Sequence, residues 1–211
     1  MQTQVLTPNQ RFSKLASDEQ IRRTARSLES NGIRTIIVND GEEAKQKVLD
    51  ILPAGAEVFD STSRTLDAIG LASEIGESQR YEKVRDRLSK LDQKTQAEEM
   101  RKTGAAPNYI IGSVHAVTED GQVLIASATG SQLGPYAYGA GSVIWVVGAQ
   151  KIVKNLDEAM RRIQEYSFPL EDKRAHDVYG TGSGVNKVLI VNREVQPGRI
   201  RMVLVKENLG F

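Results

Sequence analysis

Short apolar runs separated by amphipathic helical segments most restrict how this chain can fold. "RTIIV" at residues 34–38 and "AEVFD" at 56–60 are typical of buried strands, and "EEAKQKVLDIL" at 42–52 has the spacing of a helix between them. After residue 108 strands predominate, with "NYIIGS", "QVLIAS", "SVIWVVG", "KVLIV" and "RIRMVLV". Early strand–helix units followed by a strand-rich half predict a three-layer α/β/α fold, with a mainly parallel sheet and some antiparallel additions.

Several helices are expected around this sheet. Residues 9–30 predict an N-terminal amphipathic helix that stops at the following Asn-Gly pair. Residues 78–103 predict a long charged helix with a narrow apolar stripe, which suits either packing on the core or binding a partner. Further helices are expected within 61–75 and over 156–166. No repeat or linker divides the chain, so a single domain over residues 1–211 is predicted, with the first two helices at its periphery.

The charges of the chain nearly cancel. Its 28 Lys and Arg residues against 27 Asp and Glu residues leave a net charge of +1, so neither nucleic acid nor a membrane surface is an expected partner. No stretch approaches the roughly 20 apolar residues of a membrane span, and the N-terminus has no apolar core of signal-peptide length. A cytoplasmic protein is therefore expected.

The chain contains no cysteine, which excludes disulfides, thiolate catalysis and Cys-ligated metal or iron–sulfur centres within it. Its two histidines, His115 and His176, are far apart in sequence and have no partner at metal-ligand spacing, so no metal site is predicted. We expect no cofactor in this chain, and any iron–sulfur cluster would belong to a partner.

Polar loops that follow apolar strands are candidate sites, because open α/β sheets bind ligands at the C-terminal ends of their strands. The first such loop follows the strand at 56–60 and offers four hydroxyls and a guanidinium, which together suit an anion. Its members are Ser61, Thr62, Ser63, Arg64 and Thr65. The alternative is that Ser61 or Thr62 only caps the helix that follows.

A second candidate loop, residues 127–142, joins two strands and is longer than turning the chain requires, which favours a function. The alternative is a short helix over 132–138 that packs Tyr136 and Tyr138 into the core. The candidate ligand-binding residues of this loop are Thr129, Gly130, Ser131 and Gln132.

The third candidate loop is "GTGSGVNK" at residues 180–187. It lacks the consecutive Gly-Lys-Ser/Thr of a P-loop, and Val185 stands where the third glycine of the dinucleotide motif belongs. It also precedes a strand instead of opening a helix, so no nucleotide site is predicted. Lys187 is either a point charge for a carboxylate or phosphate, or a surface lysine. The candidate ligand-binding residues here are Gly182, Ser183, Asn186 and Lys187.

Residues 117–122, "VTEDGQ", are typical of a hairpin turn, because Asp-Gly is a favoured dipeptide in two-residue turns. Glu119 in this turn is nevertheless a candidate catalytic acid or base. No Gly-x-Ser-x-Gly pattern appears in the chain, which disfavours a serine hydrolase.

Three longer stretches together resemble the LUD domain, the lactate-utilisation family: "VHAVTEDGQVLIAS", "GSVIWVVGAQKIVKNLDEAMRRI" and the ending "NKVLIVN…QPGRIRMVLVKENLGF". The resemblance covers residues 61–211 and, weakly, the first helix. It implies a fold similar to that of ribose-phosphate isomerase, glucosamine-phosphate deaminase and the CoA transferases. The three candidate loops match family loops, except that Ser131 and Gln132 stand where many members have Asn-Arg, so one positive charge is missing.

The resemblance implies binding of a small anionic organic acid or phosphorylated ligand, in support of the oxidation of lactate or a similar acid with iron–sulfur partner subunits. A homodimer is the expected assembly. One alternative is a non-catalytic assembly or regulatory subunit that makes its contact through residues 78–103. The other is a stand-alone sugar-phosphate isomerase or CoA-transferase-like enzyme.

The enzyme alternative depends on a carboxylate. An isomerase needs one to shuttle a proton, yet the corresponding loop at 112–117 reads "GSVHAV". Lys151 in "GAQKIV" occupies the position of a lysine in the isomerase pattern and is therefore the second catalytic candidate. A CoA transferase would need a glutamate nucleophile, for which Glu207 in "KENLG" is the candidate.

Overall fold

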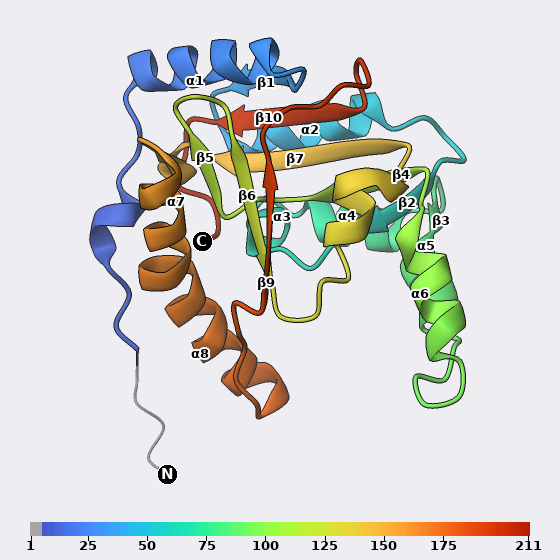
Figure 1. Ribbon diagram of the computed structural model, residues 1–211. Coiled ribbons are helices and arrows are strands. Elements are labelled where there is room, and N and C mark those ends of the chain that lie inside the picture. Colours follow the sequence, from blue (N-terminus) through green and yellow to red (C-terminus); the bar gives the residue numbers. More distant parts are fainter. Residues whose placement is uncertain (1–5) are drawn as a thin grey trace.

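Six parallel strands form the main sheet of the protein, in the order β1-β10-β7-β4-β2-β3. The computed structural model describes residues 6–211 (Figure 1). Every residue of the central strand β7 is buried, which explains why its sequence is an apolar run without polar alternation. The strands are β1 (Arg34–Val38), β2 (Glu57–Asp60), β3 (Glu82–Lys83), β4 (Tyr109–Gly112), β7 (Ser142–Gly148) and β10 (Ile200–Val205).

A second, smaller sheet supplies the antiparallel strands, in the order β8-β5-β6-β9. Strands β5 and β6 form the hairpin expected from "VTEDGQ", and Gly121 adopts the left-handed conformation (φ +80°) that its turn requires. Strand β9 pairs antiparallel with β6. The bounds are β5 (Ala116–Thr118), β6 (Val123–Ser127), β8 (Ile152–Val153) and β9 (Lys187–Val191).

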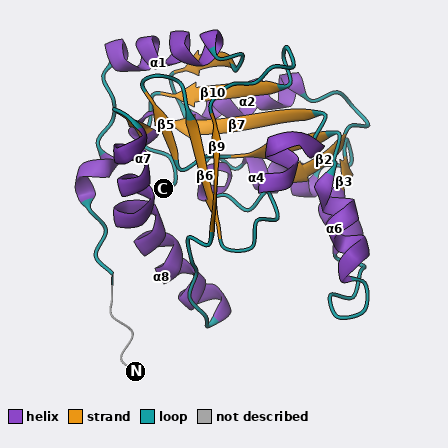
Figure 2. Cartoon of the chain, in the orientation of Figure 1, coloured by secondary structure: helices purple, strands orange, loops and turns teal. Residues whose placement is uncertain are grey.

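Helices cover both faces of the main sheet and complete the three-layer α/β/α arrangement (Figure 2). On one face, α2 (Gly41–Ile51), α3 (Arg64–Ala68) and α4 (Leu71–Glu77) bury their apolar side chains against the strands. On the other face, α1 (Asp18–Ser30) and the small sheet share a core with strands β4, β7 and β10. The far side of the small sheet packs on α7 (Leu156–Arg162).

The N-terminal helix expected over 9–30 is two elements instead of one. A 3₁₀ turn, η1 (Gln10–Ser13), is separated from α1 by extended residues. Helix α1 begins at Asp18 because Ser17 forms a capping box with Gln20, in which each side chain bonds to the other's backbone N–H. The predicted boundary was therefore wrong at its start, where a local cap overrides the longer apolar periodicity.

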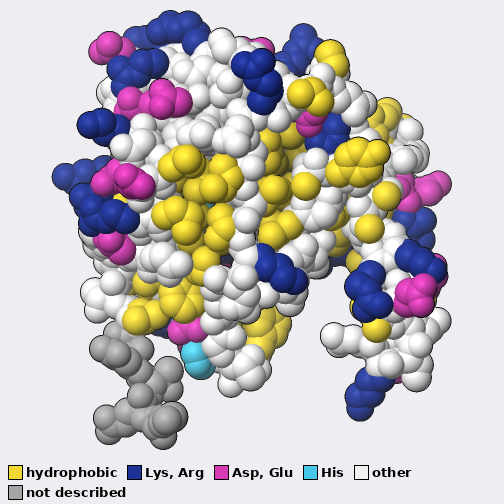
Figure 3. Space-filling model, viewed as in Figure 1, with side chains coloured by type: hydrophobic (Ala, Val, Ile, Leu, Met, Phe, Trp, Pro, Cys, Tyr) yellow, Lys and Arg dark blue, Asp and Glu magenta, His cyan; other side chains and the backbone are white. Residues whose placement is uncertain are grey.

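The long helix expected over 78–103 is also broken. The segment contains β3, α5 (Val84–Leu88) and α6 (Ala97–Ala105), and a turn separates the two helices. The Asp92 carboxylate makes this turn by accepting bonds from the backbone N–H groups of Lys94 (2.9 Å) and Thr95 (2.8 Å). Helices α5 and α6 form an arm, in which α5 packs on β2 and buries Val84 and α6 extends away from the body (Figure 1). The molecule is hollowed between this arm and the rest of the body (Figure 3).

Two further helices differ from their expected bounds. The segment 61–75 forms α3 and α4, which separate at Gly70 in the left-handed conformation (φ +69°). The helix expected over 156–166 continues to Tyr179: α7 is followed by a π-helical turn, η4 (Ile163–Ser167), and then by α8 (Phe168–Tyr179). Pro169, which has no N–H to donate, directly follows the π-helical turn in this continuous helical segment.

The hydroxyls of Ser61 and Tyr136 pack directly over the end of β4 because residue 112 is a glycine. A Cβ atom there would overlap the hydroxyls of Tyr136 and Ser61, which bond to each other at 2.7 Å. We predict that Gly112→Ala lowers the free energy of unfolding by about 1–3 kcal/mol, the usual cost of overpacking. Urea unfolding measures this change.

Gly134→Ala is the matched control, because a Cβ atom at Gly134 would meet nothing within 4 Å. Its free energy of unfolding should stay within about 0.5 kcal/mol of the wild-type value. Equal stabilities of the two variants would contradict the close packing of Ser61 and Tyr136 over Gly112.

Candidate functional site

A cavity of about 440 Å³ lies where the C-terminal ends of β2, β4 and β7 meet the small sheet and α8. Residues that follow each of these strands line the cavity. They are residues 61–65 after β2, residues 113–115 after β4, and Lys151, which lies three residues after β7 in the turn η3 (Ala149–Lys151). Arg85 and Leu88 of the arm line one side, and Phe168 and Glu171 of α8 line the other. This edge of a parallel sheet is where α/β folds bind ligands.

The structure brings together the three loops that the sequence analysis selected. Ser61, Thr62, Ser63, Arg64 and Thr65 all line the cavity. Thr129, Ser131 and Gln132 line it from the second loop, and Ser183 lines it from the third, together with Gly184 and Val185. Segments more than a hundred residues apart in sequence therefore enclose one space.

Four of the selected residues hold the loops and do not line the cavity. Lys187 donates from Nζ to the carbonyl oxygen of Thr129 (2.6 Å), and Asn186 donates to that of Ala128 (3.2 Å). Gly130 adopts φ +91° against the Lys187 side chain, and Gly182 lies against the side chains of Asp172 and His176 on α8. Asn186 and Lys187 thus hold the start of β9 against the second loop.

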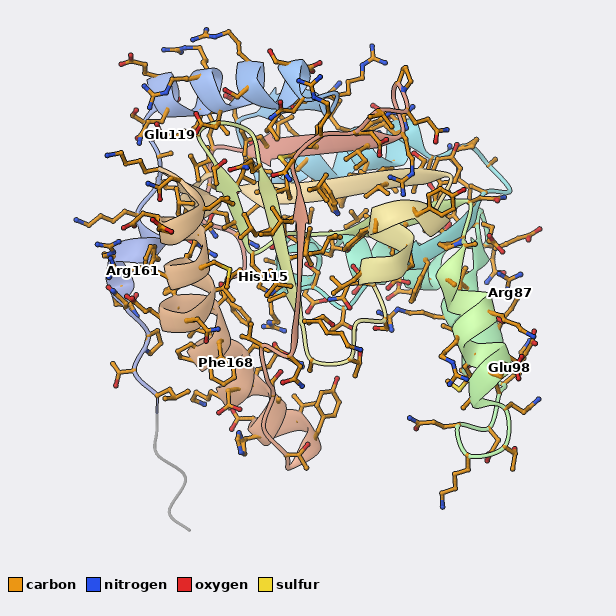
Figure 4. The ribbon with its side chains drawn as sticks, viewed as in Figure 1. Arg87, Glu98, His115, Glu119, Arg161 and Phe168 are labelled. Atoms are coloured by element: carbon orange, nitrogen blue, oxygen red, sulfur yellow. The ribbon has the colours of Figure 1, made fainter. Side chains whose placement is uncertain are left out.

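Glu119 lies outside the cavity, in the turn between β5 and β6. Its carboxylate accepts a hydrogen bond from Gln20 Nε2 (3.1 Å) and forms an ion pair with Arg23, and both partners belong to α1. Figure 4 shows Glu119 beside α1, well away from His115. The structure therefore gives this carboxylate a packing role at the hairpin instead of a place among the cavity groups.

Tyr136 and Tyr138 have opposite environments in the π-helical turn η2 (Pro135–Gly139). Tyr136 is buried, lines the cavity and shares a 2.7 Å hydrogen bond with the Ser61 hydroxyl, whereas Tyr138 is 90% exposed. Burial raises the pKa of the Tyr136 phenol above its ordinary value. The hydroxyl that Tyr136 presents is therefore neutral at physiological pH.

Lys151 is a buried amine, 1% exposed, among hydroxyl groups. Its Nζ donates to Thr65 Oγ1 (2.9 Å) and to Ser113 Oγ (3.0 Å). No carboxylate within residues 6–211 forms an ion pair with it. Burial, followed by the charge of Arg162, holds the pKa of Lys151 well below its ordinary value.

Arg162 is a second buried cation, 0% exposed, at the end of α7. One Nη donates to the His115 carbonyl oxygen and to Ser167 Oγ (3.0 Å), both on residues that line the cavity. Its Nε and second Nη have no hydrogen-bond partner among the described residues. Burial lowers the pKa of Arg162 to about 10, so the guanidinium still carries its charge at neutral pH.

His115 lines the cavity directly before strand β5 of the small sheet (Figure 4). Its Nδ1 accepts a hydrogen bond from the backbone N–H of Ala126 (3.1 Å), which leaves the proton of the neutral ring on Nε2. Burial, then the charges of Lys151 and Arg162, lower the pKa of His115 to about 3. The imidazole is consequently neutral over the physiological range.

The lining arginines of the cavity are already paired with carboxylates. Arg64, Arg85 and Arg174 form ion pairs with Asp67, Asp60 and Glu171, respectively. Glu171 accepts two hydrogen bonds from Arg174, both 2.7 Å long. Lys151 is therefore the basic group of the described lining that has no carboxylate partner, and an anionic ligand would supply one.

Sequence reasoning missed Ser113, His115, Arg162 and Arg174 as site residues. The first two follow the apolar run of β4, so the strand-end rule that selected residues 61–65 could have found them. Arg162 gives no such signal, because its carbonyl partner His115 lies 47 residues away. Within residues 6–211 the structure has no group of three His, Asp or Glu side chains placed to hold a metal ion.

The sequence matches the LUD domain family over residues 21–205. The chain belongs to this family. Among solved structures, its fold is similar to that of a DUF162 family protein from Deinococcus radiodurans, with 13% sequence identity and a TM-score of 0.54 over 91% of this chain and 99% of that one. No curated protein matches the sequence. None of the helices within residues 6–211 of this LUD protein is both long and apolar enough to cross a bilayer.

The lowered pKa of His115 makes stability depend on pH. Between the folded pKa of about 3 and the ordinary pKa of 6.5, the histidine takes up a proton only in the unfolded chain. The contribution of His115 to the free energy of unfolding is therefore fully present above pH 6.5 and is lost as the pH falls toward 3. His115→Asn retains an acceptor for the Ala126 N–H but cannot titrate. We predict that the free energy of unfolding falls between pH 7 and pH 5 in both proteins, and that the fall is smaller in the variant by on the order of 2 kcal/mol.

Urea unfolding at both pH values measures this difference. The comparison is internal to each protein, so any loss of packing at residue 115 cancels in it. Parallel dependence on pH in wild type and variant would show that His115 is not the group that resists protonation.

Proposed function

We propose that this LUD-domain protein binds a small anionic organic acid or phosphorylated ligand in the cavity. In this proposal it supports the oxidation of lactate or a similar organic acid in the cytoplasm, together with iron–sulfur partner subunits. Membership of the LUD domain family supports the metabolic part, and the cavity supports the part that concerns the ligand.

The observation that carries the proposal is a pair of buried basic side chains: Lys151, which lines the cavity, and Arg162, which lies behind the lining residues His115 and Ser167. A buried charge without a counterion costs several kcal/mol, and proteins usually pair it with an acid or neutralise it. Here the acid is missing among the described residues, while hydroxyls and carbonyl oxygens take its place. A bound carboxylate or phosphate would supply the absent counterion.

The rest of the lining suits such a ligand. Hydroxyls of Ser61, Thr62 and Ser127 and the amide of Gln132 can bond to anionic or hydroxyl oxygens. A volume of about 440 Å³ falls within the range of small-molecule sites. Apolar surface from Leu88, Ile163 and Phe168 would contact the carbon skeleton of an organic acid.

The iron–sulfur partners of this proposal are what membership of the LUD domain family implies. Removing two electrons from a hydroxy acid needs an acceptor, and iron–sulfur clusters are commonly held by cysteine thiolates. Since the chain has no cysteine, the clusters of our proposal belong to other subunits. A homodimer remains the expected assembly.

The geometry gives less support to a stand-alone isomerase or CoA transferase. The acidic side chain of the lining, Glu171, is held by Arg174 and has no free oxygen poised as a base. Glu207 does not line the cavity, and its carboxylate accepts a hydrogen bond from the backbone N–H of Gly41 (3.0 Å). Neither carboxylate fits the role that those reactions need.

Thermal unfolding with added ligands tests the proposal. We predict that one class among lactate, pyruvate, ribose 5-phosphate and acetyl-CoA raises Tm, because a ligand present at 100 times its Kd stabilises by about 2.7 kcal/mol. Lys151→Met should weaken the affinity about tenfold or more, since a charge-assisted hydrogen bond contributes roughly 1.5–3 kcal/mol.

Lys154→Met is the matched control, because Lys154 is an exposed lysine three residues further along the chain. It should retain the wild-type shift in Tm. A negative screen with every ligand class, accompanied by a stable complex with partner subunits, would instead favour an assembly role. The arm would then be the first surface to examine, since α6 buries none of its residues in this chain.

A further inference from the structure

We propose that Lys151 is an amine nucleophile that captures the carbonyl group of an anionic aldehyde or ketone as an imine. This inference rests on the proposed function, because it assigns the ligand of the same cavity to one chemical class. The class is a small oxo acid, or a phosphorylated compound with a free carbonyl group.

The position of Lys151 suits this role. Its side chain is held by η3 directly after β7, the fully buried central strand, and it reaches the cavity wall between residues 61–65 and residues 113–115. It is 1% exposed, so bulk water reaches the amine poorly. A ligand in the cavity would therefore meet the amine in an enclosed space.

The hydrogen bonds of Lys151 match those of an uncharged amine. The Thr65 hydroxyl donates its proton to the Leu209 carbonyl oxygen (3.1 Å), so its oxygen accepts from Lys151 Nζ. Ser113 Oγ accepts the second bond from Nζ. A neutral amine has two N–H bonds and one lone pair, so both donors are used and the lone pair is left for a carbonyl carbon.

The surrounding charges also favour the uncharged form. The groups that face Lys151 include the cation Arg162 and the neutral imidazole of His115, and no described carboxylate pairs with it. Burial and the neighbouring guanidinium together disfavour an ammonium ion, which is how lysine nucleophiles are activated. The pKa of Lys151 lies well below its ordinary value for these two reasons.

The proposed step balances without an oxidant or reductant. The nitrogen lone pair forms a bond to the carbonyl carbon, and the C=O π electrons move to oxygen, which takes a proton lost from nitrogen to give a carbinolamine. Loss of water from this adduct forms the C=N double bond. Protonation of the imine places a positive charge beside the anionic group of the ligand, where Arg64 and Arg162 lie close to the lining.

Reductive trapping tests the inference with two matched ligands, pyruvate and lactate. They share the carboxylate and three-carbon skeleton, but lactate has an alcohol in place of the carbonyl and cannot form an imine. The full-length wild-type protein is incubated at pH 7 with either ligand and sodium cyanoborohydride, and the modified lysines are located by peptide mass spectrometry. Glyoxylate and ribose 5-phosphate extend the series to a smaller and a phosphorylated carbonyl compound.

We expect a reduced adduct on Lys151 with at least one carbonyl compound and none with lactate. Because its position and hydrogen bonds leave a lone pair free for a carbonyl carbon, Lys151 should be labelled about tenfold or more above the exposed Lys154. Mapping in the wild-type protein makes the result independent of whether Lys151→Met folds. That variant, checked by circular dichroism, should lose the adduct and keep the background labelling of other lysines.

The failures are distinguishable. A rise in Tm with pyruvate but no adduct on Lys151, or equal labelling of Lys151 and Lys154, would overturn the amine role and leave the binding function intact. The absence of any rise in Tm with every anion would overturn the binding function itself.

Discussion

The burial of two basic side chains without an acidic partner among the described residues is the constraint on which the site depends. Lys151 and Arg162 are 1% and 0% exposed, and their hydrogen bonds go to hydroxyl and carbonyl oxygens. Such an arrangement costs stability, because the charged forms lose hydration that neutral oxygens replace only in part. Sites that retain a cost of this kind usually use it in binding or chemistry.

The topology explains how these groups come together. Strands β2, β4 and β7 are neighbours in the main sheet, and residues that follow each of them supply Thr65, Ser113 and Lys151. The π-helical turn η4 then positions residues next to Arg162 against the same cavity. The hydroxyls and the amine thus come from elements that a buried parallel sheet holds rigidly, and not from flexible loop tips.

Strands β6 and β7 could be predicted from sequence because each is an apolar run buried on both faces, as in "SVIWVVG". The loop at 61–65 could be predicted because it directly follows strand β2. The starts of helices were missed where a side chain bonds to nearby backbone, at Ser17 and at Asp92, since such bonds do not alter apolar periodicity. Arg162 and the packing role of Glu119 depend on partners 47 and 96 residues away, which one sequence does not reveal.

The two cations have different consequences for a ligand. Arg162 keeps its charge when buried, so it attracts an anion in every state of the site. Lys151 can lose its proton, so its interaction changes with the ligand: it becomes a charged donor beside a carboxylate or a nucleophile toward a carbonyl. A hydroxy acid would use the first property alone, whereas an oxo acid would use both. If our proposals hold, the site would distinguish the reduced and oxidised members of such a pair by chemistry, since their shape and charge are nearly the same.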